Sequence, residues 1–126
     1  AKLQARDEAP PPAKESRPGL TFKIGKALKV TVEAVKVQPA LSVHLIDCTV
    51  ENVGKAEVAL SGVMLQAVRF GKRLEKQELV FDKEKLKPKE KSKARLVLRL
   101  DQKADFTLEG KFGSESGKAI LGRKFL

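Results

Sequence analysis

Apolar and polar residues alternate along most of the chain that follows Leu20. The apolar positions fall first on even numbers and then on odd ones: Leu28, Val30 and Val32, followed by Val35 and Val37. A period of two is typical of a β-strand with one buried face. A slip by one residue would turn the strand over, so a β-bulge is expected near Ala34 or Val35. The pattern therefore predicts a long bulged strand that ends at Gln38-Pro39.

The same period returns in later segments, separated by turn residues. The segment Leu41–Val50 is apolar on both faces, as in a central strand, and Ser61-Gly62 interrupts the next apolar stretch, which indicates a bulge or a change of sheet. Residues 94–100 and 104–112 alternate regularly, and a hairpin then leads into a last strand over 118–125. The inward-facing residues of the two alternating segments are expected to include Leu96, Leu98, Phe106 and Leu108. About seven or eight strands at this spacing predict an all-β fold, a single immunoglobulin-like antiparallel β-sandwich.

The N-terminal segment differs from the rest in composition. Residues 1–19 contain four of the six prolines, Pro10, Pro11, Pro12 and Pro18, among Ala, Lys, Glu and Arg. Proline removes backbone donors and favours an extended chain, and the segment has no apolar period. The expected organisation is a Pro-rich flexible linker or tether over 1–19 and a β-sandwich domain over 20–126.

The chain offers few residues for catalysis or metal binding. Cys48 is the only cysteine and His44 the only histidine, so neither an internal disulfide nor a cysteine metal cage can form. His44 and Asp47 stand three residues apart and would point to opposite faces of a strand. Cys48 is expected to be a small buried apolar residue. No catalytic, cofactor-binding or metal site is expected, and the chain is interpreted as not an enzyme, with no small-molecule substrate.

The net charge of +10 is concentrated in the C-terminal half, where residues 71–126 carry sixteen basic and nine acidic groups. Between Lys83 and Arg95 every odd position is basic: Lys83, Lys85, Lys87, Lys89, Lys91, Lys93 and Arg95. In an extended chain these cations would follow one edge at intervals of about 6.6 Å. Such a basic track would suit an anionic polymer, nucleic acid or glycan, or an anionic membrane surface. The alternative is a solvated connection whose charges discourage edge-to-edge aggregation.

Two short motifs carry a resemblance that covers roughly Val30 to Leu100. The segment Thr49–Ala56 has the form T-V-x-N-x-G-x-A, and Leu86–Glu90 has the form L-x-P-x-E before a strand. This order resembles small immunoglobulin-like sandwiches of bacterial and archaeal envelope proteins. Examples are the CARDB modules and the C-terminal domains of membrane proteins that carry an N-terminal zinc ribbon. Those families usually place Gly where this chain has Lys89.

The resemblance implies a non-enzymatic spacer or docking module outside the cytoplasm. The sequence therefore predicts an interaction or spacer module, tethered to a membrane or a larger assembly, with a protein partner and no cofactor. The expected location is extracytoplasmic, in a periplasm or at a cell surface. The alternative function is binding of anionic polymers through residues 83–95. Salt separates the two, because polymer binding through several lysines weakens steeply as ionic strength rises.

Overall fold

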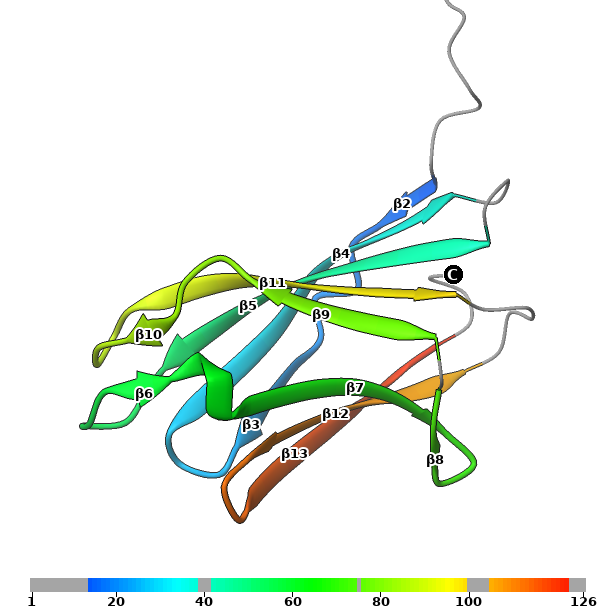
Figure 1. Cartoon of the computed structure of the whole chain (residues 1–126). Coiled ribbons are helices and arrows are strands. Elements are labelled where there is room, and N and C mark those ends of the chain that lie inside the picture. The colour runs from blue at the N-terminus through cyan, green and yellow to red at the C-terminus, as the bar shows by residue number, and fades with distance from the viewer. Residues whose placement is uncertain (1–13, 39–41, 75, 100–104, 123–126) are drawn as a thin grey trace, which may run out of the picture.

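Short and long antiparallel strands make up almost all of the computed structural model, which describes residues 14–38, 42–74, 76–99 and 105–122 (Figure 1). Along the chain the elements are β2 (Lys14–Ser16), β3 (Thr21–Ile24), β4 (Leu28–Gln38), β5 (Val43–Asn52), β6 (Val58–Ala59), the 3-10 helix η2 (Leu60–Gly62), β7 (Val63–Arg69), β8 (Lys72–Arg73), β9 (Gln77–Phe81), β10 (Lys85–Leu86), β11 (Lys91–Arg99), β12 (Phe106–Phe112) and β13 (Glu115–Leu121). Within these ranges no helix has the length and apolar character needed to cross a bilayer.

The long strands form two sheets packed face to face. The first sheet has the order β2–β4–β5–β11–β9, with β3 also paired to β4, and the second has the order β13–β12–β7–β8. Figure 1 shows β4, β5, β11 and β9 as one layer above β7, β12 and β13. The orders β4–β5–β11–β9 and β13–β12–β7 correspond to the orders A–B–E–D and G–F–C of the two sheets in a constant-type immunoglobulin domain. The predicted immunoglobulin-like β-sandwich is therefore confirmed.

The inner faces of the two sheets supply the core, in the alternation that the sequence predicts. In β4 the residues Leu28, Val30 and Val32 are buried, and the register against β5 shifts between Val32 and Ala34. The buried set then continues at Val35 and Val37. The predicted bulge is confirmed, and it keeps both halves of this long strand facing the core.

The predicted core of the later strands is confirmed as well. Leu96, Leu98, Phe106 and Leu108 are all buried, whereas Arg95 and Arg99, on the other face of β11, are exposed. The chain changes sheets at η2, which leads from β6 to β7 and includes Ser61-Gly62, where the sequence indicates a bulge or a change of sheet.

The sheet begins before the predicted domain boundary. Lys14, Glu15 and Ser16 pair with Val37, Lys36 and Val35, so β2 extends the first sheet into the segment assigned to the tether. β2 and β3 follow one another along the same edge of β4. Residues 1–13 of the predicted tether lie outside the described residues, and residues 17–19 connect β2 to β3.

The last strand begins earlier than its sequence suggests. β12 and β13 are joined by Gly113-Ser114 alone, because Phe112 pairs directly with Glu115. Gly113 has a φ of 61°, as expected of the first central residue of a type II′ hairpin turn. The strand expected over 118–125 is therefore corrected to Glu115–Leu121, and residues 123–126 lie outside the described residues.

Candidate functional site

The basic track does not form one continuous edge. Lys83 lies in the connection after β9, Lys85 in β10, and Lys87 and Lys89 in the turn that reverses the chain before β11. Only Lys91, Lys93 and Arg95 share a strand face, the exposed side of β11. The expectation of seven cations along one edge is corrected for this reason. Alternation in sequence places side chains on one line only while the backbone stays extended, and here it turns back at Pro88.

The reversal has the features of a type II turn. The N–H of Glu90 donates to the carbonyl of Lys87 at 3.0 Å, Pro88 stands at the second position, and Lys89 at the third has a φ of 72°. The N–H of Lys89 donates to the carbonyl of Asn52 at 2.8 Å, which docks the turn on the end of β5. The third position of this turn favours glycine, the residue that the families with a similar motif usually have there.

Replacing Lys89 with glycine should therefore raise the free energy of unfolding, by up to about 1 kcal/mol, because a left-handed conformation costs a residue with a Cβ more than it costs glycine. Urea unfolding of the full chain measures the change. Lys87→Gly is the matched control, since it removes the same charge at a residue without a positive φ and should not stabilise. A Lys89→Gly variant less stable than the parent would contradict this account of the turn.

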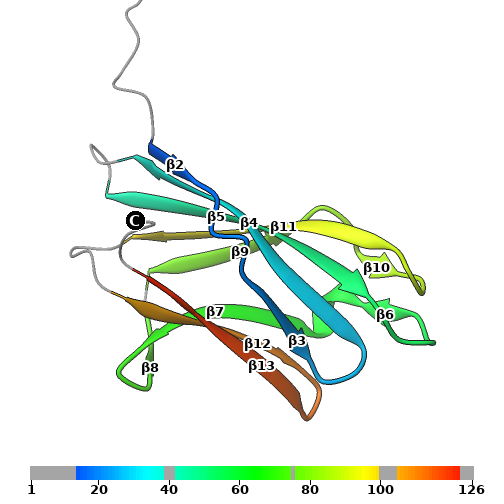
Figure 2. The same ribbon diagram turned by 180° about the vertical axis from the view of Figure 1, so that it is seen from behind.

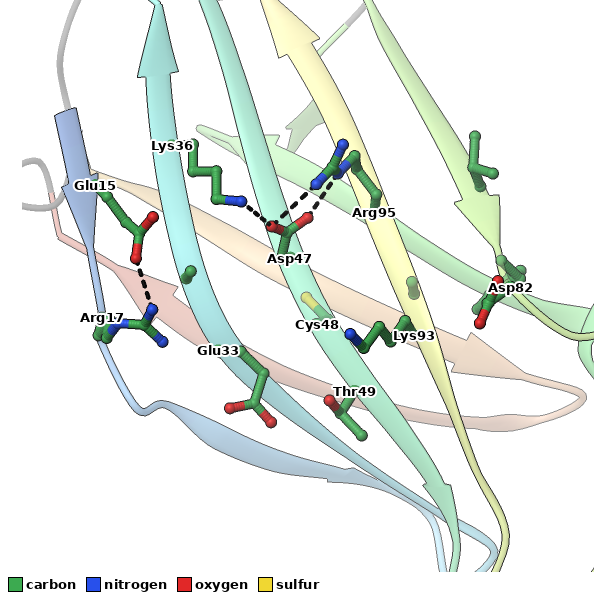
Figure 3. A pocket seen from close by; sticks show the side chains of 14 residues that line it. Glu15, Arg17, Glu33, Lys36, Asp47, Cys48, Thr49, Asp82, Lys93 and Arg95 are labelled. Carbon is green, nitrogen blue, oxygen red and sulfur yellow. Dashed lines mark hydrogen bonds and ion pairs between the residues drawn. The ribbon is translucent and has the colours of Figure 1, made fainter. Parts of the chain in front are cut away.

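Arg95 is occupied by an ion pair. Its Nε lies 2.7 Å from Oδ1 of Asp47 and its Nη2 lies 3.2 Å from Oδ2, a two-pronged contact across β5 and β11 (Figure 3). Lys36 on β4 reaches the same carboxylate, with its Nζ 3.5 Å from Oδ2. Partial burial alone would raise the pKa of Asp47, but the hydrogen bonds and charges of Arg95 and Lys36 hold that pKa below its usual value. A charge so compensated contributes little to holding a polyanion.

The carboxylate lies in an open groove on the outer face of the first sheet, with a volume of about 930 Å³. Four basic residues line the groove (Arg17, Lys36, Lys93 and Arg95), and four acidic residues balance them (Glu15, Glu33, Asp47 and Asp82). Figure 3 shows these eight side chains on β2, β4, β5 and β11 and on the residues that directly follow β2 and β9. The groove has no net formal charge, unlike the chain as a whole.

Cys48 also lines the groove, but its side chain faces inward and is only 2% exposed. Burial, with smaller contributions from the charges of Asp47 and Glu33, raises the pKa of the Cys48 thiol to about 12. The thiol is therefore protonated at neutral pH and is a poor nucleophile. The prediction that Cys48 is a small buried residue is confirmed.

His44 is buried on the inner face of β5, whereas Asp47 lies on the outer face, as their spacing predicts. Among the residues that the structure describes, no three His, Cys, Asp or Glu side chains come close enough to hold a metal ion.

An apolar patch lies beside the ion pairs on the same outer face. It consists of Val43 and Leu45 on β5, Val97 on β11 and Val80 on β9. Leu45 and Val97 are direct cross-strand partners, and Val80 is diagonal to Val97 because it pairs with Arg95. The first three are half-buried and Val80 is 53% exposed. The sequence shows apolar residues on both faces of β5. That β11 and β9 complete the patch is known only from their pairing in the sheet.

The sequence matches no family model and no curated protein. Among solved structures, the archaellum periplasmic stator protein FlaG from Sulfolobus acidocaldarius has a similar fold, with a TM-score of 0.51 and 13% sequence identity. The similarity covers 81% of this chain and 100% of that chain. At this identity the match extends to the fold alone. The likeness to CARDB modules and zinc-ribbon membrane proteins remains a resemblance of short motifs, while the similarity to a solved structure is one of β-sandwich architecture.

Proposed function

We propose that this chain is a non-enzymatic β-sandwich interaction module that binds a protein partner through the outer face of the β4–β5–β11–β9 sheet. The observation that carries the proposal is the apolar patch of Val43, Leu45, Val80 and Val97. The solvent-facing side of an antiparallel sheet is ordinarily polar, whereas here neighbouring strands place apolar side chains together. A contiguous apolar patch on a soluble surface is a common feature of interaction sites.

The surroundings of the patch favour a protein over a polyanion. An apolar centre with a polar rim is the usual composition of a protein interface. The Asp47–Arg95 pair and the balanced groove form such a rim without an excess of positive charge. The six lysines of the basic track are divided among a connection, a short strand, a turn and β11, so no observation favours the polymer-binding alternative.

The proposed setting is an extracytoplasmic assembly. The similarly folded FlaG is by its name a periplasmic stator protein of the archaellum, and so belongs to a larger assembly. In this setting the Pro-rich residues 1–13 would tether the sandwich to a membrane or a larger complex, as the sequence suggests. The module would then act as a spacer or docking part, without a cofactor.

The test is a double substitution that makes the patch polar while preserving the sheet. Val80→Glu places a carboxylate opposite Arg95, and Val97→Lys places a cation opposite Glu78, so both new charges have a cross-strand partner of opposite sign. The control, Met64→Glu with Ile120→Lys, makes the same charge changes at two exposed apolar residues on the outer face of the second sheet. All three proteins should unfold at similar urea concentrations.

Each protein is then used to purify partners from detergent-solubilised envelopes of the source cells, at low and at high salt. We expect one protein to be retained by the parent and the control at both salt concentrations. Its recovery with Val80→Glu/Val97→Lys should fall by about tenfold or more, the effect of removing an apolar interface centre. Equal recovery with all three proteins would refute docking through this face. Retention that disappears at high salt in every case would support the polymer-binding alternative instead.

A further inference from the structure

The hairpin between β7 and β8 has an unusual residue at its tip. Arg69 pairs with Lys72, so the loop is only Phe70-Gly71, and both residues have positive φ, 54° and 74°. Two positive φ values are the mark of a type I′ turn, whose first central residue is favourably Asn, Asp or Gly. A bulky residue with positive φ is uncommon and costs conformational energy.

The Phe70 ring also gains nothing from the folded domain, since it is 95% exposed. An aromatic side chain on a strained turn, fully open to solvent, is unfavourable both for the backbone and for hydration. Backbone strain that the local contacts do not repay is a feature of functional positions. A ring presented in this way is suited to a contact outside the chain.

Basic residues surround the ring on both sides. Arg69 precedes it, and Lys72 and Arg73 follow it on the exposed strand β8. Between Val63 and Arg73 the chain has no acidic residue. Phe70, Lys72 and Arg73 are exposed, while the Nε of Arg69 lies 3.4 Å from the carbonyl of Asp105, an acidic residue that is also exposed. An apolar ring flanked by the cations of Lys72 and Arg73 is complementary to a surface whose outer layer is anionic and whose interior is apolar.

The tip lies at the end of the sandwich where β2 begins. Leu28, at the start of β4, pairs with Asn52 at the end of β5. The side chain of Asn52 donates to the carbonyl of Leu86 on β10, and β10 pairs with β6, the strand just before η2 and β7. β4 and β7 therefore start at the same end, and both run toward the other end, where Lys14 of β2 pairs with Val37. Figures 1 and 2 both show β2 and β8 at the end opposite β6 and β10.

We propose that the β7–β8 tip inserts Phe70 into the interfacial region of an anionic lipid bilayer, with Lys72 and Arg73 against the headgroups. An apolar side chain gains by leaving water for the acyl boundary, and nearby Lys and Arg side chains are attracted to anionic lipid. The tip of the hairpin carries one aromatic ring flanked by cations, an arrangement that can contact a flat lipid surface. The contact is separate from the sheet face proposed for the protein partner, and a chain tethered at β2 would present this end to the membrane.

A tryptophan at the tip provides the direct test. The chain has no Trp and no Tyr, so the fluorescence of a Phe70→Trp variant reports from this position alone. The full chain is mixed at low salt with vesicles of phosphatidylcholine containing about one third phosphatidylglycerol, and with vesicles of phosphatidylcholine alone. We expect the emission to shift to the blue with the anionic vesicles only, and brominated acyl chains to quench it. Bound protein with unshifted, unquenched emission would overturn the insertion.

Co-sedimentation with the same anionic vesicles tests the side chains. Phe70→Asn suits a type I′ turn, so that variant should be at least as stable as the parent, yet its partition onto vesicles should fall by about tenfold or more. Lys72→Ser with Arg73→Ser should weaken partition and reduce its salt dependence. Met64→Asn, an exposed apolar residue at the other end of β7, is the control and should bind as the parent does.

Val80→Glu/Val97→Lys should also bind vesicles as the parent does, which separates this contact from docking through the sheet face. Equal sedimentation of the parent and Phe70→Asn would refute the proposal. Failure of the parent to bind anionic vesicles at low salt would refute it too. Phe70 would then fit an apolar pocket, surrounded by acidic residues, on a partner protein.

Discussion

Replacing Asn52 with alanine is expected to lower the free energy of unfolding by about 3 kcal/mol, far more than its position in a turn-like sequence suggests. Asn52 ends β5 and has no solvent-exposed surface. Its Nδ2 donates to the carbonyls of Ala56 at 2.7 Å and Leu86 at 3.0 Å, and its Oδ1 accepts from the N–H of Gly54 at 2.9 Å. One amide thus joins the loop after β5 to β10, and its loss leaves three backbone groups without their partner.

Asn52→Asp is the informative companion, because it keeps an acceptor for Gly54 but directs a carboxylate at the carbonyl oxygens of Ala56 and Leu86. Burial against these oxygens would raise the pKa of the new carboxyl in the folded state. The loss of unfolding free energy relative to the parent should therefore be smallest at low pH, where the new carboxyl is protonated in both states. The loss should grow as pH rises through the unfolded-state pKa of about 3.9. Urea unfolding at several pH values measures both effects. A loss below about 1 kcal/mol for Asn52→Ala would show that water replaces the amide.

Substitution of Gly117 by alanine is expected to be comparably severe, with a loss of about 3 kcal/mol or more. β13 passes close to β3 (Figure 2). Gly117 lies on β13, and a Cβ there would collide with the backbone carbonyl of Lys23 on β3. It would also come within 3.2 Å of Cδ2 of Phe22, a core residue. Because the obstruction is backbone, no rotamer change relieves it, and β3 must move away from β13.

Gly62→Ala is the matched control for this prediction. A Cβ at Gly62 would meet only the ring of Phe112, at 3.5 Å, which is ordinary van der Waals contact. Thermal and urea unfolding should therefore show a small change for Gly62→Ala and a large one for Gly117→Ala. Similar stability of the two variants would mean that the contact between β3 and β13 is loose and adds little to the packing of the sheets.

The exposed Phe70 tip and the apolar patch could not be recognised as sites before the strands were paired. The sequence shows Gly71-Lys72-Arg73 as a turn, with Phe70 as the end of the apolar stretch before it, and only the pairing of β7 with β8 places Phe70 at the exposed tip. Val80 and Val97 read as members of separate strands, and only the pairing of β9 with β11 places them side by side. Conversely, the regular alternation from Lys83 to Arg95 suggests a single basic edge, which the turn at Pro88 divides.

Local periodicity by itself determined the β-sandwich class, the bulge in β4, and the inward residues of β11 and β12. Successive side chains of a strand point to opposite faces, so this information is contained within a few neighbouring residues. The tertiary structure alone decided which strands are neighbours. Arg95 meets Asp47, 48 positions away in the chain, because burial of both inner faces selects one register between β5 and β11. The compensated charge of Asp47 and the contact of Leu45 with Val97 both depend on that register, which no local pattern specifies.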